Sequence, residues 1–200
     1  MTRIGILVYD GFDLIDAGGP YEVFLTAARL QQRAGEDAGF EVALVSPGGA
    51  DAVAFGGMTL TALGAAEEAG PFDVVVIPGT IDVAAAAGDP RIAAAVAALV
   101  SGAGLTTSVC TGSFLLARGG ILAGLPATTH WEDVADLARE EVADAVAGMR
   151  WVDAGDVVTS GGLTSGIHMA LHVVARVAGV DLAHATARQL DMDWSASPER

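Results

Sequence analysis

The single cysteine of the chain, Cys110, is the residue best suited to nucleophilic chemistry. It follows the predicted strand 105–109 and precedes Gly112 and a short helical pattern at 113–118. A strand, a sharp turn and a helix form a nucleophile elbow, which lifts one side chain above the end of a sheet. The N–H of Thr111 is then free to face a substrate, and the helix N-terminus favours the thiolate. A free cysteine is also a common small core residue, so its place at a strand end is what favours catalysis.

The elements that position this cysteine are predicted from alternating apolar segments. Short β-branched runs predict buried strands at 4–9, 40–46, 74–77 and 105–109, with shorter ones at 150–153 and 157–159. Amphipathic or alanine-rich segments predict helices at 20–33, 91–101, 113–118, 131–142, 164–178 and 181–191. Pro20 suits the first position of its helix, and residues 52–60 fit a small hairpin.

This alternation predicts an α/β fold with a mostly parallel sheet covered by helices on both faces. No linker or shift in composition divides the chain, so we expect one domain over residues 1–200. In such folds ligands bind outside the carboxyl ends of the strands, which is where Cys110 lies.

Composition and charge exclude several classes of protein. With 52% hydrophobic and 18% charged residues the chain is not intrinsically disordered. A formal net charge of −15 disfavours nucleic acids and anionic membranes as partners. One cysteine forms no disulfide within the chain, which favours a reducing compartment, and we expect a cytoplasmic protein. The N-terminal apolar run is too short for a signal peptide, and no stretch is long enough to span a membrane.

Metal and cofactor sites are not predicted. His168 and His172 stand four residues apart on an expected helix, a spacing that can bind zinc, but no third ligand accompanies them. Ordinary helix histidines are the favoured interpretation. Neither a phosphate-binding loop nor a dinucleotide-binding glycine pattern is present, so we expect neither a metal nor an organic cofactor.

Several segments in order resemble the ThiJ/PfpI superfamily, relatives of the class I glutamine amidotransferases. They include the start of the chain at 5–12 and 19–24, Ile77-Pro78-Gly79, the cysteine turn at 109–112, residues 127–131 and residues 159–167. The resemblance spans about residues 3–190 and is greatest to the isonitrile hydratase branch. It implies a flavodoxin-like sandwich, a homodimer and no cofactor. A second similar group is the ligand-sensing domain of certain AraC-type regulators.

The resemblance also implies roles for individual residues. An acid after the first strand hydrogen-bonds the nucleophile in this superfamily, which matches Asp16, with Asp13 and Glu22 as nearby alternatives. Backbone N–H groups of Gly79, Thr80 and Thr111 would form the oxyanion site, and Thr80 stands where relatives carry a second glycine.

Further residues are expected around the substrate. His130 falls where many relatives carry a histidine near the cysteine, in an orienting or a purely structural role. Ile81, Phe114 and Trp131 flank the site segments and are expected to make its mouth apolar, which would disfavour a charged substrate.

The activity expected from this set is hydration of an isonitrile, a small electrophile, to an N-substituted formamide. Cys110 would attack the terminal carbon and Asp16, with a raised pKa, would transfer the proton. Two alternatives remain open. A glyoxalase-type α-oxoaldehyde hydratase needs the same groups, and a non-catalytic ligand or redox sensor would also use an acid-paired cysteine.

Overall fold

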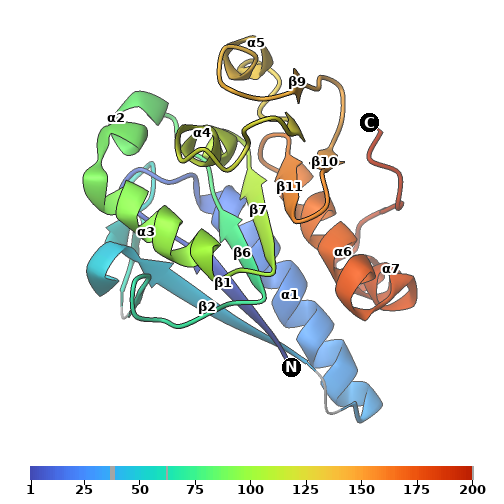
Figure 1. Cartoon of the computed structure of the whole chain (residues 1–200). Coiled ribbons are helices and arrows are strands. Elements are labelled where there is room, and N and C mark those ends of the chain that lie inside the picture. The colour runs from blue at the N-terminus through green and yellow to red at the C-terminus, as the bar shows by residue number, and fades with distance from the viewer. Residues whose placement is uncertain (37–38, 62, 200) are drawn as a thin grey trace.

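A seven-stranded sheet crosses the centre of the computed structural model, which describes residues 1–36, 39–61 and 63–199 (Figure 1). Its strands, in spatial order, are β10 (Trp151–Asp153), β11 (Val157–Ser160), β7 (Leu105–Val109), β6 (Val74–Ile77), β1 (Thr2–Leu7), β2 (Phe40–Ser46) and β5 (Gly64–Ala65). All neighbours pair in parallel except β10 and β11, which pair antiparallel. The predicted mostly parallel sheet is confirmed.

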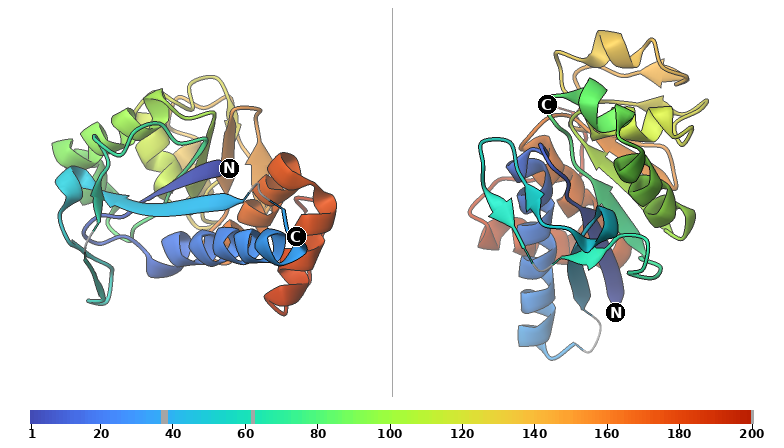
Figure 2. Two further views of the ribbon diagram at one scale, coloured as in Figure 1. Left: turned by 90° about the horizontal axis from the view of Figure 1, so that it is seen from below. Right: turned by 90° about the vertical axis from the view of Figure 1, so that its left-hand side faces the viewer.

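Helices cover both faces of this sheet, as predicted (Figure 2). One face carries α1 (Leu14–Ala34), α6 (Ser165–Ala178) and α7 (Val180–Gln189), which pack against one another. The other carries α2 (Val83–Gly88), α3 (Pro90–Ser101) and α4 (Gly112–Arg118). All four residues of β6 and all five of β7 are buried, because both faces of the central strands lie under helices.

Smaller elements complete the chain. The expected hairpin is formed by β3 (Ala52–Val53) and β4 (Thr59–Leu60), after the short 3₁₀ turn Pro47–Gly49. A second small pair consists of β8 (Pro126–Ala127) and β9 (Asp144–Ala145). The short helix α5 (Val134–Leu137) lies beyond the carboxyl edge of the sheet (Figure 1).

The first helix starts earlier than predicted. It begins at Leu14, with Asp13 as its N-cap, so Pro20 lies inside the helix instead of at its first position. Proline has no N–H, so the helix lacks the hydrogen bond that would join residue 20 to the carbonyl of Asp16. The early start places Asp16 in the first helical turn and not in a loop.

Two other helix predictions need correction. The helix expected over 131–142 is only α5, because Leu137 is its one buried residue and Trp131 is exposed, so little packing supports a longer helix. Helix α2 was not predicted, although Asp82 caps it by accepting a hydrogen bond from the N–H of Ala85. Within the described ranges, no helix is both long and apolar enough to cross a membrane.

Candidate active site

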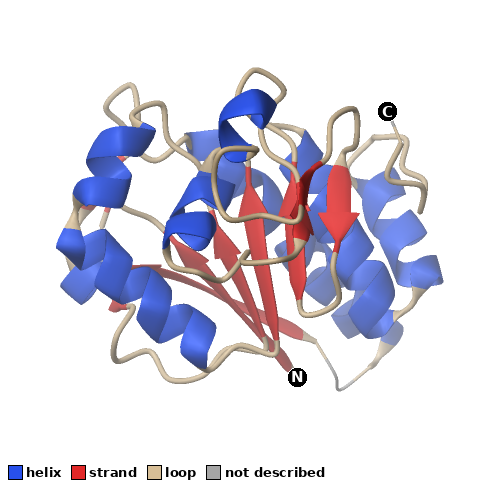
Figure 3. Ribbon diagram, turned by 45° about the horizontal axis from the view of Figure 1, so that its top comes forward, coloured by secondary structure: helices blue, strands red, loops and turns tan. Residues whose placement is uncertain are grey.

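The candidate site lies where the parallel strands end. Figure 3 shows these carboxyl ends meeting at one edge of the sheet, under loops. Asp16 follows β1, Gly79 and Thr80 follow β6, and Cys110 follows β7 directly. The chain runs from β1 outward to β2 and then returns to β6 on the other side of β1. Such a switch in strand order is the usual ligand-binding position of an open α/β sheet.

Cys110 stands on a sharp turn with a left-handed backbone, at φ 55°. Its N–H donates to the carbonyls of Ser160 and Gly161, both at 3.2 Å, and its carbonyl accepts from Thr129 Oγ1 at 2.9 Å. These bonds hold a conformation that costs a non-glycine residue free energy. Gly112 is required beside it, because a Cβ there would lie 2.2 Å from the carbonyl oxygen of Ile77. The local geometry is therefore that of a nucleophile elbow.

The Asp16 carboxyl is fully buried and joins the loop after β6. Its Oδ2 accepts a hydrogen bond from the N–H of Gly79 at 3.0 Å. Burial, and next the negative charge of Asp13, raise the pKa of Asp16 to about 7. The N–H groups of Gly79 and Leu163 and the thiol of Cys110 lower this pKa by smaller amounts. Oδ1 itself has no hydrogen-bond partner in the described part of the chain.

The pKa of the Cys110 thiol is higher than the sequence predicts. Burial, and next the charge of Asp16, raise its pKa to about 12, while hydrogen bonding from Thr111 lowers it less. The start of α4 does favour the thiolate, because the N–H of its N-cap residue Thr111 lowers the pKa of Cys110, but burial and the charge of Asp16 outweigh this effect. The charge of Asp16 raises the pKa of Cys110, and the thiol of Cys110 lowers the pKa of Asp16, so the protonation of each group depends on the other.

The expected oxyanion donors at Gly79 and Thr80 are already occupied. The Gly79 N–H donates to Asp16, and the Thr80 N–H donates to Thr111 Oγ1 at 2.9 Å. Thr111 Oγ1 in turn donates to the Thr80 carbonyl at 2.7 Å. Thr80 Oγ1 donates to the Gly11 carbonyl at 2.8 Å, a bond that a glycine could not make. The threonine therefore fixes the loop. Of the three expected donors, the N–H groups of Gly79 and Thr80 are occupied, and that of Thr111 lies beside the Cys110 sulfur.

A cavity of about 380 Å³ opens over the cysteine. Its lining residues are Asp13, Thr80, Ile81, Val83, Cys110, Thr111, His130, Glu132, Asp133 and Leu163. Phe114 and Trp131 are not among them, since Phe114 is buried in the core and Trp131 is 65% exposed. The expectation of an apolar mouth is therefore wrong in part: Ile81 lines it, but three carboxylates do so as well.

His130 lies within this acidic part of the lining. Its Nδ1 is 3.5 Å from Asp133 Oδ2 and 3.7 Å from Glu132 Oε2. Gly162 passes against the ring, where a Cβ would lie 2.2 Å from His130 Cδ2. The structure thus places His130 beside the cavity, held by carboxylates and backbone.

Leu163 was missed from the sequence. It has a left-handed backbone, at φ 56°, its N–H lies near Asp16, and its side chain lines the cavity. A leucine after two glycines carries no recognised signal for this conformation. Asp13 was considered only as a substitute for Asp16, whereas the structure places it in the cavity wall, with no hydrogen bond from its side chain to cap α1.

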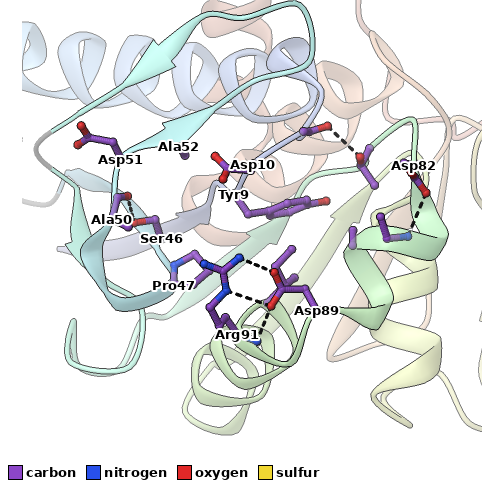
Figure 4. Close-up of a pocket in the computed structure, with 15 residues that line it drawn as sticks. Tyr9, Asp10, Ser46, Pro47, Ala50, Asp51, Ala52, Asp82, Asp89 and Arg91 are labelled. Carbon is purple, nitrogen blue, oxygen red and sulfur yellow. Dashed lines mark hydrogen bonds and ion pairs between the residues drawn. The ribbon is translucent and has the colours of Figure 1, made fainter.

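A second cavity, of about 180 Å³, also has Thr80 in its lining. Figure 4 shows this cavity with Asp10, Asp82 and Asp89 around it. Four of its five charged side chains, all except Asp51, have partners among the described residues. Asp89 binds Arg91 at 2.7 Å, and Asp10 Oδ1 accepts from the N–H of Val53 at 2.9 Å. Asp82 caps α2.

The histidine pair of α6 has separate surroundings. His172 lies 2.7 Å from Asp153 and stacks on Trp151, with ring centroids 5.0 Å apart. His168 Nδ1 is buried and has no hydrogen-bond partner among the described residues. Among the residues that the structure describes, no three His, Cys, Asp or Glu side chains are grouped to hold a metal ion.

Known proteins resemble this chain along most of its length. A model of the DJ-1/PfpI family matches residues 2–176. An isonitrile hydratase from Pseudomonas putida is 30% identical over 199 residues, which cover 98% of this chain and 80% of that protein. A crystal structure of a ThiJ/PfpI family protein from Pseudomonas syringae has a TM-score of 0.84 and 26% identity, covering 96% of this chain and 75% of that one.

A transcriptional regulator is also similar. The HTH-type regulator GbdR of Pseudomonas aeruginosa is 29% identical over 185 residues, which cover 91% of this chain. The match takes up only 48% of the regulator.

Proposed function

The chain belongs to the DJ-1/PfpI family, and on that premise we propose that it hydrates an isonitrile to an N-substituted formamide, with Cys110 as nucleophile. The observation that carries the proposal is the coupled pair of Cys110 and Asp16 at the elbow. The raised pKa of Asp16, about 7, means that the pair holds one proton between two groups above neutral pH. A nucleophile and an acid that exchange one proton are what this hydration needs.

The first step forms a carbon–sulfur bond. The Asp16 carboxylate takes the thiol proton as the sulfur attacks the terminal carbon of R–N≡C. The same proton then passes from Asp16 to that carbon, which gives the thioimidate R–N=CH–S–Cys and restores the carboxylate. Because a buried thiol with a high pKa is a poor nucleophile, proton removal by Asp16 and attack belong to one event.

The second step consumes water. Asp16 accepts a proton from a water molecule that adds to the thioimidate carbon, and passes this proton to the imine nitrogen, which restores the carboxylate. The carbon–sulfur bond then breaks, the hydroxyl proton returns to sulfur through Asp16, and R–NH–CHO leaves. One isonitrile and one water thus give one formamide, and Cys110 ends as a thiol.

The occupied backbone donors favour an isonitrile over an α-oxoaldehyde. Attack on a carbonyl places negative charge on oxygen, and enzymes stabilise that charge with free N–H donors. The N–H groups of Gly79 and Thr80 already donate to Asp16 and Thr111, so only one of the three expected donors, the N–H of Thr111, is left for an oxyanion. Attack on an isonitrile instead places the negative charge on the terminal carbon. Asp16 supplies the proton that neutralises this charge.

Turnover of cyclohexyl isocyanide tests this function directly. We expect the wild-type protein to form N-cyclohexylformamide, Cys110→Ala to form none, and Asp16→Asn to lose at least about 100-fold in kcat/KM, in line with the loss of a general acid–base. Circular dichroism controls for folding. Formamide production that survives Cys110→Ala would overturn the proposal.

The similarity to a regulator favours a sensor as the second candidate. A sensor would bind a small molecule in the same cavity without turnover. Loss of turnover in Cys110→Ser with intact folding favours the enzyme. Failure to convert isonitriles and α-oxoaldehydes, together with ligand-dependent association, favours the sensor.

A further inference from the structure

The wall of the cavity over Cys110 carries charge of one sign. Asp13, Glu132 and Asp133 line it, and none of its lining residues is a lysine or an arginine. The Glu132 side chain is 62% exposed and that of Asp133 35%, so both stand at the opening. Their charges act on a molecule that enters.

Within the lining, three carboxylates face a single basic side chain. His130 is the one basic side chain in the lining, and even a protonated imidazole balances only one of three carboxylates. Arg139, the first arginine after Asp133 in the sequence, pairs with Asp136, and Arg118 pairs with Glu140 at 3.4 Å.

A fourth carboxyl lies next to the sulfur. Asp16 is fully buried, and its Oδ1 has no hydrogen-bond partner within the described residues. Asp16 does not line the cavity, but its negative charge acts on the sulfur, where it raises the pKa of Cys110. It has the same sign as the three carboxylates of the wall.

We propose that the cavity selects electrophiles whose substituent is cationic over those whose substituent is anionic, with Glu132 and Asp133 as the specificity-determining residues. Like charge in a cleft lowers the local concentration and the association rate of an anion, and opposite charge raises them. Applied to the proposed function, on which this inference rests, an isonitrile with an ammonium group is a better substrate than an equally large one with a carboxylate. Ile81, Val83 and Leu163 supply the apolar contact for the carbon part of the substituent.

Labelling of Cys110 tests this preference without any turnover. Cys110 is the only cysteine in the sequence, so each thiol reagent reports on this cavity alone. Two methanethiosulfonates of similar size are compared, one with a trimethylammonium-ethyl group and one with a sulfonatoethyl group. Each transfers its thioalkyl group to sulfur and releases methanesulfinate. Their rates are divided by their rates with free 2-mercaptoethanol.

We expect the cationic reagent to react about tenfold faster than the anionic one after this correction at low ionic strength, with the ratio falling as salt screens the wall. Glu132→Gln/Asp133→Asn should reduce the ratio at least threefold. Glu68→Gln removes the same charge from an exposed position outside the lining and should leave the ratio unchanged. The single variants Glu132→Gln and Asp133→Asn replace the double variant if it misfolds.

A corrected ratio near one, or a ratio that the double variant leaves unchanged, overturns the inference. The inference is also overturned if Cys110 reacts with neither reagent and not with neutral methyl methanethiosulfonate, because the sulfur is then not accessible from the cavity. The proposed function is tested separately by neutral cyclohexyl isocyanide. If the protein shows the labelling preference but forms no formamide, the charge selectivity is supported and the hydratase function is contradicted.

Discussion

At the scale of single residues, the chemistry depends on one proton shared by two buried groups. Burial acts on both side chains in the same direction, raising the pKa of Asp16 to about 7 and that of Cys110 to about 12. The forms with thiol and carboxylate, or with thiolate and carboxylic acid, contain the same number of protons. The site is therefore competent while the pair holds one proton, whichever group holds it.

This pairing predicts how activity depends on pH. Below about pH 7 the carboxyl of Asp16 is protonated and takes no proton from the thiol, so kcat/KM should fall by about tenfold per pH unit. Above about pH 8 it should be level. The charge of Asp13 is the second largest cause of the raised pKa of Asp16, after burial. Asp13→Asn removes this charge, so the fall in kcat/KM should occur at a lower pH. The pH profile of isonitrile turnover between pH 5 and pH 9 measures both effects, and a flat profile from pH 5 to pH 8 would contradict them.

Thr111 is predicted to hold the elbow against the loop after β6. Its hydroxyl accepts from the N–H of Thr80 and donates to the carbonyl of the same residue. Thr111→Val keeps the shape but leaves both buried groups unpaired, which should cost about 2 kcal/mol or more in the free energy of unfolding and lower kcat/KM. Thr111→Ser keeps the hydroxyl and is the matched control. Urea unfolding and kinetics of the two variants check this, and equal behaviour would refute the role.

The sequence was sufficient to single out Cys110 and Asp16 but not the state of the site around them. Residue types and their order predict the elbow, because strand, turn and helix signals are local. The occupation of the Gly79 and Thr80 N–H groups depends on contacts 63 and 31 residues away in the chain. Burial of the thiol, the backbone of Leu163 and the acidic wall also arise only when distant segments pack.

At the scale of elements, the junction of β7 and α4 fixes the position of the nucleophile. Gly112 begins α4 against the carbonyls of Ile77 and Pro78 at the end of β6. The close approach of two strand ends therefore depends on the missing side chain of one glycine.

Gly112→Ala should disrupt this junction. The added Cβ would lie 2.2 Å from backbone oxygen, which cannot move like a side chain, so we expect a loss of about 3 kcal/mol or more in stability and no measurable turnover. Gly88→Ala is the control, because that exposed glycine in α2 has open space around it. Thermal unfolding and turnover of both variants provide the measurement. An active, stable Gly112→Ala protein would contradict the account.

Buried strands were easier to predict than helix ends. The β-branched runs of β6 and β7 specify buried strands by composition alone. The start of α1 was misplaced because Pro20 is also a common first helical residue, whereas here packing of α1 keeps the proline inside. Helix α5 was overestimated because its apolar spacing has almost no core to contact.

At the scale of the whole molecule, the homodimer implied by the family resemblance stays a prediction. Ile81 and Trp131 are 64% and 65% exposed, and association near the cavity would remove them from water. Sedimentation velocity should give twice the 20.1 kDa mass of the chain. A monomer at all concentrations would show that each chain forms its site alone.

The central claim is that Cys110 adds to the carbon of an isonitrile. Its most direct test is the intact mass of the protein after rapid acid quenching during turnover of cyclohexyl isocyanide, followed by peptide mapping. The account predicts an increase by the mass of one whole isonitrile, located on Cys110 and absent from Cys110→Ala. Formamide produced at the wild-type rate with no adduct on this cysteine, and undiminished in Cys110→Ala, would contradict it.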